Sequence, residues 1–470
     1  MNSWEWESFE RILNEGTFSV TSEGPLHGPI EKFSFKRNEN LEIILETTST
    51  DISGLRPNPP RTALGTVQIN TEKVELTDLS GIKATLTGVE TRERVTKLNG
   101  QYERKETSAI SSIKVIKSSS ESVYTIDWLT NVDNRFYLWP DLIVDKITTS
   151  KTRTLHPDEI TLRSEEEKKN RRSGCVGITI NGLKIYVGVA TSRNEKNTIR
   201  KGFVLYPGTP SDGTREKIRN CLSFSLGMYL VYLGHSTFDS NWLLTSFEAI
   251  SGYTLDKDFI MPTLPPANIG SRGINELSST SLSRMVNALY LHYDDLNFRH
   301  LNWMYWHAAY APIHAAPVLF GATIEALQRA YLEKSDKNIQ TLLDKVAWDD
   351  LKNKIKAAIS NLVVSDEMKK ILSDKIVDFK KAPQKIISER LFIELNLELG
   401  GAEKDAWKQR DYAGHGSTAP NEDFVKLVRD NKLLRIRFNR MLLRMVNGSD
   451  NYYDFYTIGH AVRNLQDPIP

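Results

Sequence analysis

The chain has 470 residues, enough for two or three domains that each bury a core of their own. Its composition is that of an ordinary globular protein, with 40% hydrophobic residues, 26% charged residues and a formal net charge of +2. A charge so close to zero excludes a chain that binds polyanions over its whole surface, so any nucleic-acid surface must be local.

Apolar runs and cysteines lead us to expect a cytoplasmic protein that makes no contact with a membrane. The stretch Met1 to Glu7 is acidic and broken by polar residues, unlike a signal peptide. The best apolar run, Leu226 to Leu233, is far shorter than the roughly 20 residues of a spanning helix. Cys175 and Cys221 fit a reducing compartment and predict neither a disulfide framework nor a metal site.

Residues 1–275 are predicted to be β-rich. Gly, Pro and Asn residues separate short alternating runs, which is typical of an antiparallel sheet or barrel. A mixed-charge run at 165–172 is interpreted as a solvated helix or linker, and it marks a candidate subdivision of this region near residue 165. The predicted strands before that run lie at 32–35, 41–47, 63–69, 83–89, 111–116 and 123–129.

A hairpin and a helix are the clearest elements that follow. Asn181-Gly182 between two β-branched runs predicts a two-residue hairpin turn. Thr214 to Leu233 carries an apolar stripe with helical spacing, and Gly234 is predicted to end this helix. Further strands are predicted at 201–206 and 242–246.

The main domain boundary is predicted near residue 275, after a linker rich in Pro and Gly. Residues 276–470 show helical periodicity nearly to the end, so we expect an all-α bundle there and an α+β protein as a whole. The predicted helices lie at 318–333, 348–362, 366–379, 383–399, 402–412 and 422–446.

Four histidines open the helical region, at His292, His300, His307 and His314. The last three are seven residues apart, so they share a helix face but lie about 10 Å apart along the axis, too far to hold one metal ion. We interpret them as partly buried helix residues. The aromatic residues among them are interpreted as core or dimer-interface residues rather than base-stacking groups: Trp303, Tyr305, Trp306 and Tyr310.

Arg410 and His415, with four residues between them, are the candidate catalytic pair. A histidine passes protons near neutral pH, and an arginine stays charged and binds phosphate in bidentate fashion. Together they suit metal-independent RNA cleavage, in which a base activates the 2′-hydroxyl and a fixed cation stabilises the phosphorane. Asp411 is placed to orient its neighbours. The alternative is structural: Arg410 caps a helix and His415 sits in the glycine-rich turn after it.

The last predicted helix is unusually basic. Its cations are interpreted either as a wall that follows a phosphate backbone or as a face in solvent or paired with acids elsewhere in the bundle. These cations are Lys426, Arg429, Lys432, Arg435, Arg437, Arg440 and Arg444.

These features resemble a HEPN domain, and more closely the ApeA-like HEPN proteins of bacterial antiphage defence. The resemblance rests on the helix from Gly321 to Leu327, on Arg410 to Gly416, and on the basic helix after them. In the first half it rests on Arg219 to Gly227 with Leu233-Gly234 and Phe238-Asp239.

The resemblance implies a metal-independent endoribonuclease that uses no cofactor and has an Arg-x(4 to 6)-His motif. Arg410 and His415 match the motif, and Asp411 matches its polar position. It also implies a homodimer with a composite cleft, cleavage of tRNA or other RNA once infection is sensed, and 2′,3′-cyclic phosphate ends. The alternative is a HEPN module without nuclease activity, which dimerises or binds RNA while the β-rich half senses a phage component. A weaker alternative, a metal-dependent hydrolase on the histidine-rich helix, has no ligand cluster to support it.

Overall fold

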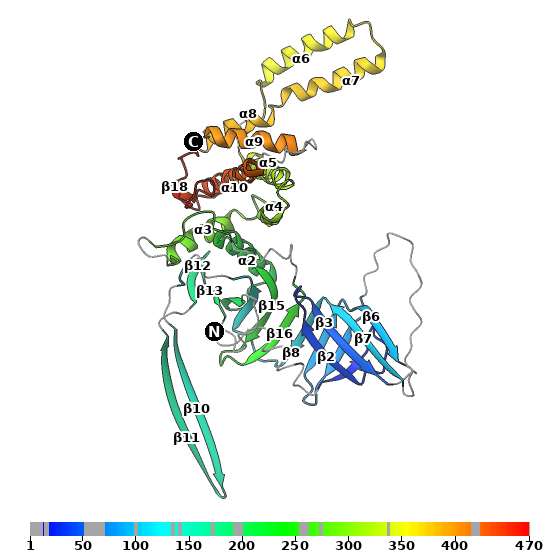
Figure 1. Cartoon of the computed structure of the whole chain (residues 1–470), viewed down its shortest axis with the longest axis vertical. Helices are drawn as coiled ribbons and strands as arrows, with labels where there is room; N and C mark the ends of the chain where they lie inside the picture. Colours follow the sequence, from blue (N-terminus) through cyan, green and yellow to red (C-terminus); the bar gives the residue numbers. More distant parts are fainter. Residues whose placement is uncertain are drawn as a thin grey trace. The chain divides into compact units, whose positions relative to one another are not determined.

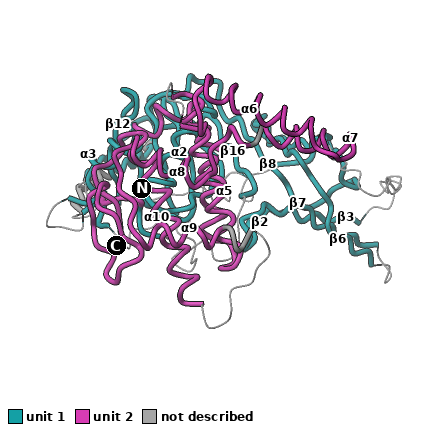
Figure 2. Tube along the Cα trace, turned by 90° about the horizontal axis from the view of Figure 1, so that it is seen from above, with its two compact units in different colours: residues 1–265, 269–287 teal, residues 266–268, 288–470 magenta. Residues whose placement is uncertain are grey.

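The computed structural model describes Leu13 and residues 18–50, 71–97, 102–132, 137–139, 143–170, 174–190, 201–252, 263–271, 276–335, 339–414 and 424–469. The chain forms two compact units (Figure 2). The first contains residues 1–265 and 269–287, and the second contains residues 266–268 and 288–470. The predicted α+β class, with a β-rich region before a helical bundle, is confirmed. The predicted boundary at residue 275 lies outside the described residues and stays a prediction.

Two large antiparallel sheets form most of the first unit (Figure 1). The smaller contains, from edge to edge, β2 (Lys32–Arg37), β3 (Ile43–Ser49), β7 (Glu103–Ile110) and β6 (Glu90–Lys97). The larger has ten strands in the order β1 (Ser19–Ser22), β4 (Val74–Thr77), β5 (Lys83–Thr87), β8 (Ser112–Ile116), β16 (Leu244–Ile250), β15 (Val231–Phe238), β9 (Tyr124–Thr130), β14 (Lys201–Pro207), β13 (Leu183–Val189) and β12 (Cys175–Ile180).

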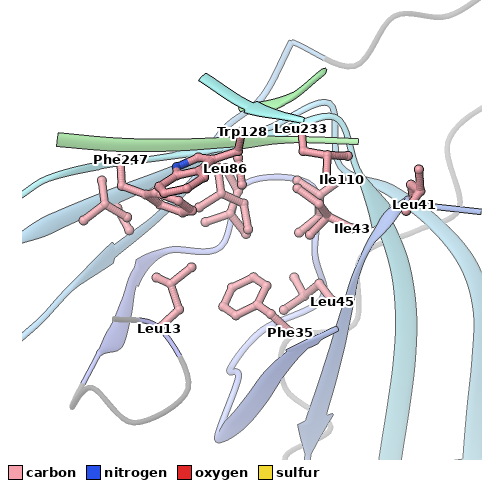
Figure 3. Packing of buried hydrophobic residues seen from close by; sticks show 14 of the residues in the cluster. Leu13, Phe35, Leu41, Ile43, Leu45, Leu86, Ile110, Trp128, Leu233 and Phe247 are labelled. Atoms are coloured by element: carbon pink, nitrogen blue, oxygen red, sulfur yellow. The ribbon is translucent and has the colours of Figure 1, made fainter. Parts of the chain in front are cut away.

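A shared hydrophobic core joins the two sheets. Alternate side chains of a strand point to the same face, so each sheet contributes one apolar face. Phe35 and Leu45 come from the smaller sheet, and Trp128 and Phe247 come from the larger one. Figure 3 shows these side chains gathered between the strands. Trp128 is buried with its Nε1 donating to Ser236 Oγ at 2.8 Å, which satisfies its polar atom inside the core.

Most predicted strands are confirmed, and the hairpin at Asn181-Gly182 is confirmed with its turn. Asn181 has φ 46° and Gly182 has φ 81°, the left-handed conformation at both positions that a type I′ turn requires. Cys175–Ile180 and Leu183–Val189 pair around this turn. The predicted strand at 63–69 lies outside the described residues.

Helix α2 (Asp212–Leu226) ends earlier than predicted. Gly227 adopts φ 68° and donates its N–H to Phe224, while Met228 donates to Ser223, so the C-terminal carbonyls are satisfied there. The predicted continuation to Leu233 is therefore wrong. Val231 and the residues after it leave the helix because they pair with β9.

The charged run at 165–172 was predicted as a helix or linker, and this is wrong for residues 165–170. They belong to β11 (Asp158–Asn170), which pairs antiparallel with β10 (Ile143–Leu155) in a two-stranded ribbon (Figure 1). A run of mixed charges is compatible with a strand as well as with a helix, so the composition alone did not distinguish the two.

Helices build the second unit. Four of them pack as a bundle: α4 (Phe298–Tyr310), α5 (Ala316–Lys334), α9 (Gly401–Gly414) and α10 (Phe424–Val446). The other elements are α3 (Ser279–Leu291), which crosses the division between the units, α6 (Lys345–Ser360), α7 (Asp366–Ile376), η3 (Val377–Lys380), α8 (Gln384–Glu394), β17 (Asn451–Tyr453) and β18 (Val462–Asn464). No helix among the described residues has the length and apolarity needed to cross a membrane.

Candidate functional site

Arg410 lies one turn before the C-terminal end of α9 and is held by α5. Its Nη2 donates to Glu325 Oε1 in an ion pair, and its guanidinium carbon lies 4.7 Å from the centre of the Trp407 ring. The Arg410 and Glu325 side chains are 22% and 27% exposed, so solvent reaches both partners. The arrangement fixes the direction of the guanidinium while leaving the site accessible to a charged ligand.

Gly321 explains how α5 and α9 approach closely enough for this pairing. A Cβ at position 321 would lie 2.5 Å from Arg410 Cγ and 2.7 Å from Cδ, distances that no side chain tolerates without movement. Gly321 and Glu325 are four residues apart on α5 and therefore share one face. Gly321 leaves room for the aliphatic stem of Arg410, and Glu325 forms an ion pair with its guanidinium.

Asp411 and His415 complete the predicted site. Asp411 continues α9 as the next residue after Arg410. His415 follows the last described residue of this helix and lies outside the described residues. The structure therefore brings Arg410 together with Gly321, Glu325 and Trp407, and the pairing of Arg410 with His415 stays a prediction.

A second arginine lies against the same tryptophan. Arg437 on α10 is 3% exposed, and its guanidinium carbon lies 4.3 Å from the Trp407 ring centre and 5.2 Å from that of Phe392. Its Nη2 donates to Ser388 Oγ, and its buried Nε has no hydrogen-bond partner in the described part of the chain. Stacking on aromatic rings thus replaces the carboxylate that a buried arginine ordinarily has.

The charge on Arg437 affects the surroundings of Arg410. Burial lowers the pKa of Arg437 to about 10, the Glu403 carboxylate opposes this shift, and repulsion from Arg410 adds to it. Two guanidinium groups therefore lie against one indole ring. This concentration of positive charge favours an anion, such as a phosphodiester, near Arg410.

The interpretation of α10 as a phosphate-binding wall is wrong for Arg437 and Arg440, because both are buried. Arg435 turns inward as well, with its Nε donating to Tyr305 at 2.8 Å. Of the seven cations, the exposed ones are Lys426, Arg429 and Lys432, in the first half of the helix. The buried arginines pair with carbonyls, hydroxyls and carboxylates from distant parts of the chain, which the charge pattern of α10 does not reveal.

The prediction of partly buried helix residues is confirmed for His307 on α4, but it is wrong for His292, His300 and His314, which are exposed. On α4, Trp303 is 52% exposed and its ring centre lies 3.9 Å from that of His307. Trp303 is therefore a surface residue, in contrast to the buried Trp306. Among the described residues, no group of three His, Cys, Asp or Glu side chains is arranged to hold a metal ion.

The first unit contains a charged cluster that the sequence did not predict. Asp127 of β9 is fully buried and accepts hydrogen bonds from Arg215 and Arg219 of α2 and from Tyr206, whose hydroxyl is 3.2 Å away. Although burial opposes charge on the two arginines, the Asp127 carboxylate keeps their pKa above the ordinary value. Asp212, 70% exposed, approaches the Nη2 atoms of the same arginines at 3.3 and 3.5 Å. The sequence feature that could have indicated this cluster is Asp127, a single aspartate within an otherwise mostly apolar strand.

His235 at the border of this cluster predicts a pH-dependent stability. Burial, with a further contribution from Arg215, lowers the pKa of His235 from 6.5 to about 4, and its Nδ1 lies 2.9 Å from the Tyr232 hydroxyl. Between pH 6.5 and pH 4 His235 is protonated in the unfolded chain but stays neutral in the folded chain. The free energy of unfolding therefore falls as the pH falls from 6.5 towards 4. At pH 5 we expect His235 to have lowered the free energy of unfolding of the first unit by about 2 kcal/mol.

The measurement is a urea titration at pH 7.5 and pH 5, read by pulse proteolysis and quantified on peptides of the first unit. His235→Gln should show a smaller loss than the wild type by about this amount. An equal loss in both proteins would show that His235 does not cause it.

The described geometry thus assembles Arg410, Gly321, Glu325, Trp407 and Arg437 into one site on the second unit. No family model, curated protein or solved structure matches this chain.

Proposed function

We propose that this chain is a metal-independent endoribonuclease of bacterial antiphage defence, as its resemblance to ApeA-like HEPN proteins implies. The observation that supports the proposal most directly is the position of Arg410. A glycine on α5 makes room for its stem, and Glu325 and Trp407 orient its guanidinium. Such a fixed, solvent-accessible cation is what a phosphoryl-transfer site needs, because it needs no reorganisation as charge develops.

In the proposed reaction His415 acts as general acid and base. It removes the proton of the 2′-hydroxyl, the 2′-oxygen attacks the adjacent phosphorus, and Arg410 stabilises the charge of the phosphorane. The bond from phosphorus to the 5′-oxygen then breaks, and this oxygen receives a proton. The products carry a 2′,3′-cyclic phosphate and a 5′-hydroxyl. Asp411 would hold the geometry of its neighbours, and no metal or cofactor takes part.

The proposal includes a cellular setting. RNA, most simply tRNA, is the expected substrate, and a phage protein is the expected trigger. The β-rich half is assigned the sensing role and the helical half the cleavage. We also propose a homodimer, because a twofold arrangement would let two motifs form one cleft.

The test is RNA cleavage by the purified full-length chain in EDTA, with total tRNA as substrate. We expect His415→Ala to lower the cleavage rate by about 100-fold or more, because general acid–base catalysis contributes 10²–10⁴-fold. Arg410→Ala should also lower the cleavage rate by about 100-fold. Lys408→Ala is the matched control, because Lys408 is an exposed cation on the same helix that pairs with Asp405, and we expect no change.

The ends of the products complete the test. Cyclic phosphate ends from the wild type, together with their loss in the His415 variant, would establish the activity and its acid–base group. Equal cleavage by the wild type and His415→Ala would assign the activity to other residues and reject the proposed pair.

A second candidate function is a HEPN module without nuclease activity, which dimerises or binds RNA while the first half senses a phage component. The ion pair of Arg410 with Glu325 favours this alternative, since it gives the arginine a structural role in joining α9 to α5. The same assay with phage lysate added distinguishes the two. If the wild type cleaves no RNA in either condition, the binding module is preferred.

A further inference from the structure

Helices α6 and α7 form a hairpin that the proposed catalysis does not use (Figure 1). The two helices have 16 and 11 residues and pack on each other. Their shared hydrophobic core is small, with Trp348, Ile359 and Ile376 as its buried residues. Helices this short are only marginally stable in water without a packed surface, so burial of a second surface would stabilise the hairpin.

Large apolar side chains are exposed beside this small core. On α7, Met368, Ile371 and Leu372 are 57%, 53% and 40% exposed. On α6, Leu351 is 36% exposed, and the exposed Ala347 and Ala358 lie one and two turns from it on the same flank. An exposed set of apolar residues with helical spacing is typical of an interaction surface.

The exposed flanks of α6 and α7 lie on the same side of the hairpin. On each helix an exposed leucine precedes a residue of the small core by four positions, Leu351 before Ile355 and Leu372 before Ile376. The rotation from the core to the flank therefore has the same sense about both helix axes. Because the helices run in opposite directions, this equal rotation brings both flanks to one side. We call this side the hairpin face; its residues are Ala347, Leu351, Ala358, Met368, Ile371 and Leu372.

The charges along each helix are ordered. Residues 344–351 carry three aspartates and one lysine, and residues 352–360 carry three lysines and no acid. Residues 366–368 carry two acids, and residues 369–381 carry five lysines and two aspartates. Both helices are therefore acidic at the start and basic towards the end. A helix with this order is complementary to a second one that runs in the opposite direction.

The border of the hairpin face carries both signs of charge in the same order. Asp350 and Lys354 border it on α6, and they pair with each other at 2.8 Å while both stay largely exposed. Glu367 and Lys375 border it on α7, one turn on either side of Ile371. A nucleic acid or an anionic membrane would need cations along the whole border, and the two acids oppose such a partner.

A second copy of the chain fits this surface. A twofold axis brings the same face of two subunits together, so the face must be complementary to itself. When the axis runs along the helices, α6 of one copy lies against α7 of the other, and these helices are antiparallel. When the axis runs across the helices, each helix lies antiparallel to its own copy. In both cases the acidic start of one helix meets the basic end of another.

We propose that the hairpin face joins two copies of this chain about a twofold axis, with the helices antiparallel across the contact. The apolar residues would be buried at the centre, and the charged residues of the border would pair around them. This inference rests on the proposed function only in naming the surface of its homodimer. It does not depend on RNA cleavage, and its tests measure association alone.

The first experiment measures the dimer Kd of the full-length chain by sedimentation equilibrium. We expect the wild type to form a dimer of twice the 53.5 kDa of one chain. Ile371→Glu should weaken the dimer Kd at least tenfold, because it places a charge in the apolar centre. Val346→Glu is the matched control and should change the Kd by less than twofold. Val346 is also an exposed aliphatic residue, but it lies two positions before Trp348 and therefore on the side of α6 away from the core.

Three outcomes of this experiment would overturn the proposal. They are a monomeric wild type, an unchanged dimer in Ile371→Glu, and equal weakening by Ile371→Glu and Val346→Glu. An unchanged dimer would keep the homodimer of the proposed function and assign it to a different surface.

The second experiment tests the charged border by mixing two full-length variants. One carries Asp350→Lys with Glu367→Lys, and the other carries Lys354→Glu with Lys375→Glu. Each border then has a single sign, so each variant alone should dimerise at least tenfold more weakly than the wild type. The mixture should form a heterodimer at least tenfold tighter than either homodimer, which would also show that both variants are folded. A mixture that associates no better than its components would overturn the antiparallel contact.

Discussion

Asp127→Asn is expected to lower the free energy of unfolding of the first unit by about 3–5 kcal/mol, the usual cost of breaking a buried ion pair from one side. Asp127 is fully buried and accepts hydrogen bonds from both Arg215 and Arg219. Asparagine keeps the size of the side chain but removes its charge. Two guanidinium groups would then face each other in a poorly solvated site, with the exposed Asp212 as their remaining carboxylate partner in the described cluster.

Hydrogen–deuterium exchange with mass spectrometry measures this loss in the full-length chain. Amides of β9 and β15 should exchange faster by the factor that corresponds to the lost free energy, while amides of α10 in the second unit provide an internal reference. Asp212→Asn is the matched control. Because its side chain is 70% exposed, we expect an effect below about 1 kcal/mol. A similar effect of both variants would show that Asp127 is not the residue that stabilises the arginines.

Elements with a strong local signal could be predicted from the sequence. Asn181-Gly182 has few conformations available other than a tight hairpin turn, and the strands beside it formed as expected. The helices of the second unit that carry a continuous apolar stripe, such as Ala316–Lys334, also lie where they were predicted. In both cases the deciding information is contained within a few neighbouring residues.

The errors arose where the deciding partner is distant in sequence. The predicted helix from Thr214 to Leu233 has a suitable stripe, but the residues from Val231 onward pair with β9, about 100 positions earlier. Residues 165–170 form a strand because Ile143 to Thr148 lie beside them. A periodic pattern states which side chains can share a face, and it does not state which segment will lie next to them.

In the candidate site, too, the residues with a local sequence signal were predicted, whereas the contacts made by distant segments were not. Arg410 and Asp411 were predicted from the motif, and Glu325 lies in the helix from Gly321 to Leu327 on which the resemblance rests. The role of Trp407 could have been suspected, since it lies three residues before Arg410 on one helix. The contact of Gly321 with Arg410 and the burial of Arg437 depend on how α5, α9 and α10 pack. Those contacts are tertiary, and no local pattern carries them.

Glu403→Gln is expected to lower the free energy of unfolding of the second unit by about 3–5 kcal/mol, because it leaves a buried cation without its carboxylate. The Glu403 and Arg440 side chains are both completely buried, and Arg440 Nη1 lies 2.6 Å from Glu403 Oε1. The other oxygen of Glu403 accepts the N–H of Gly400 at 2.9 Å, at the start of α9. Arg440 also donates to the carbonyls of Glu398 and Leu465, so its charge ties three parts of the chain together.

Exchange of the α9 and α10 amides in the full-length chain measures this effect, with β9 amides of the first unit as the reference. Asp405→Asn is the matched control, because Asp405 lies on the same helix, is 68% exposed and pairs with the exposed Lys408. If the loss comes from an unpaired charge, adding Arg440→Met to Glu403→Gln should cost at least about 2 kcal/mol less than the sum of the two single effects. Additive effects would instead mean that the carbonyl contacts of Arg440, rather than its pairing with Glu403, hold α9 and α10 to the end of the chain.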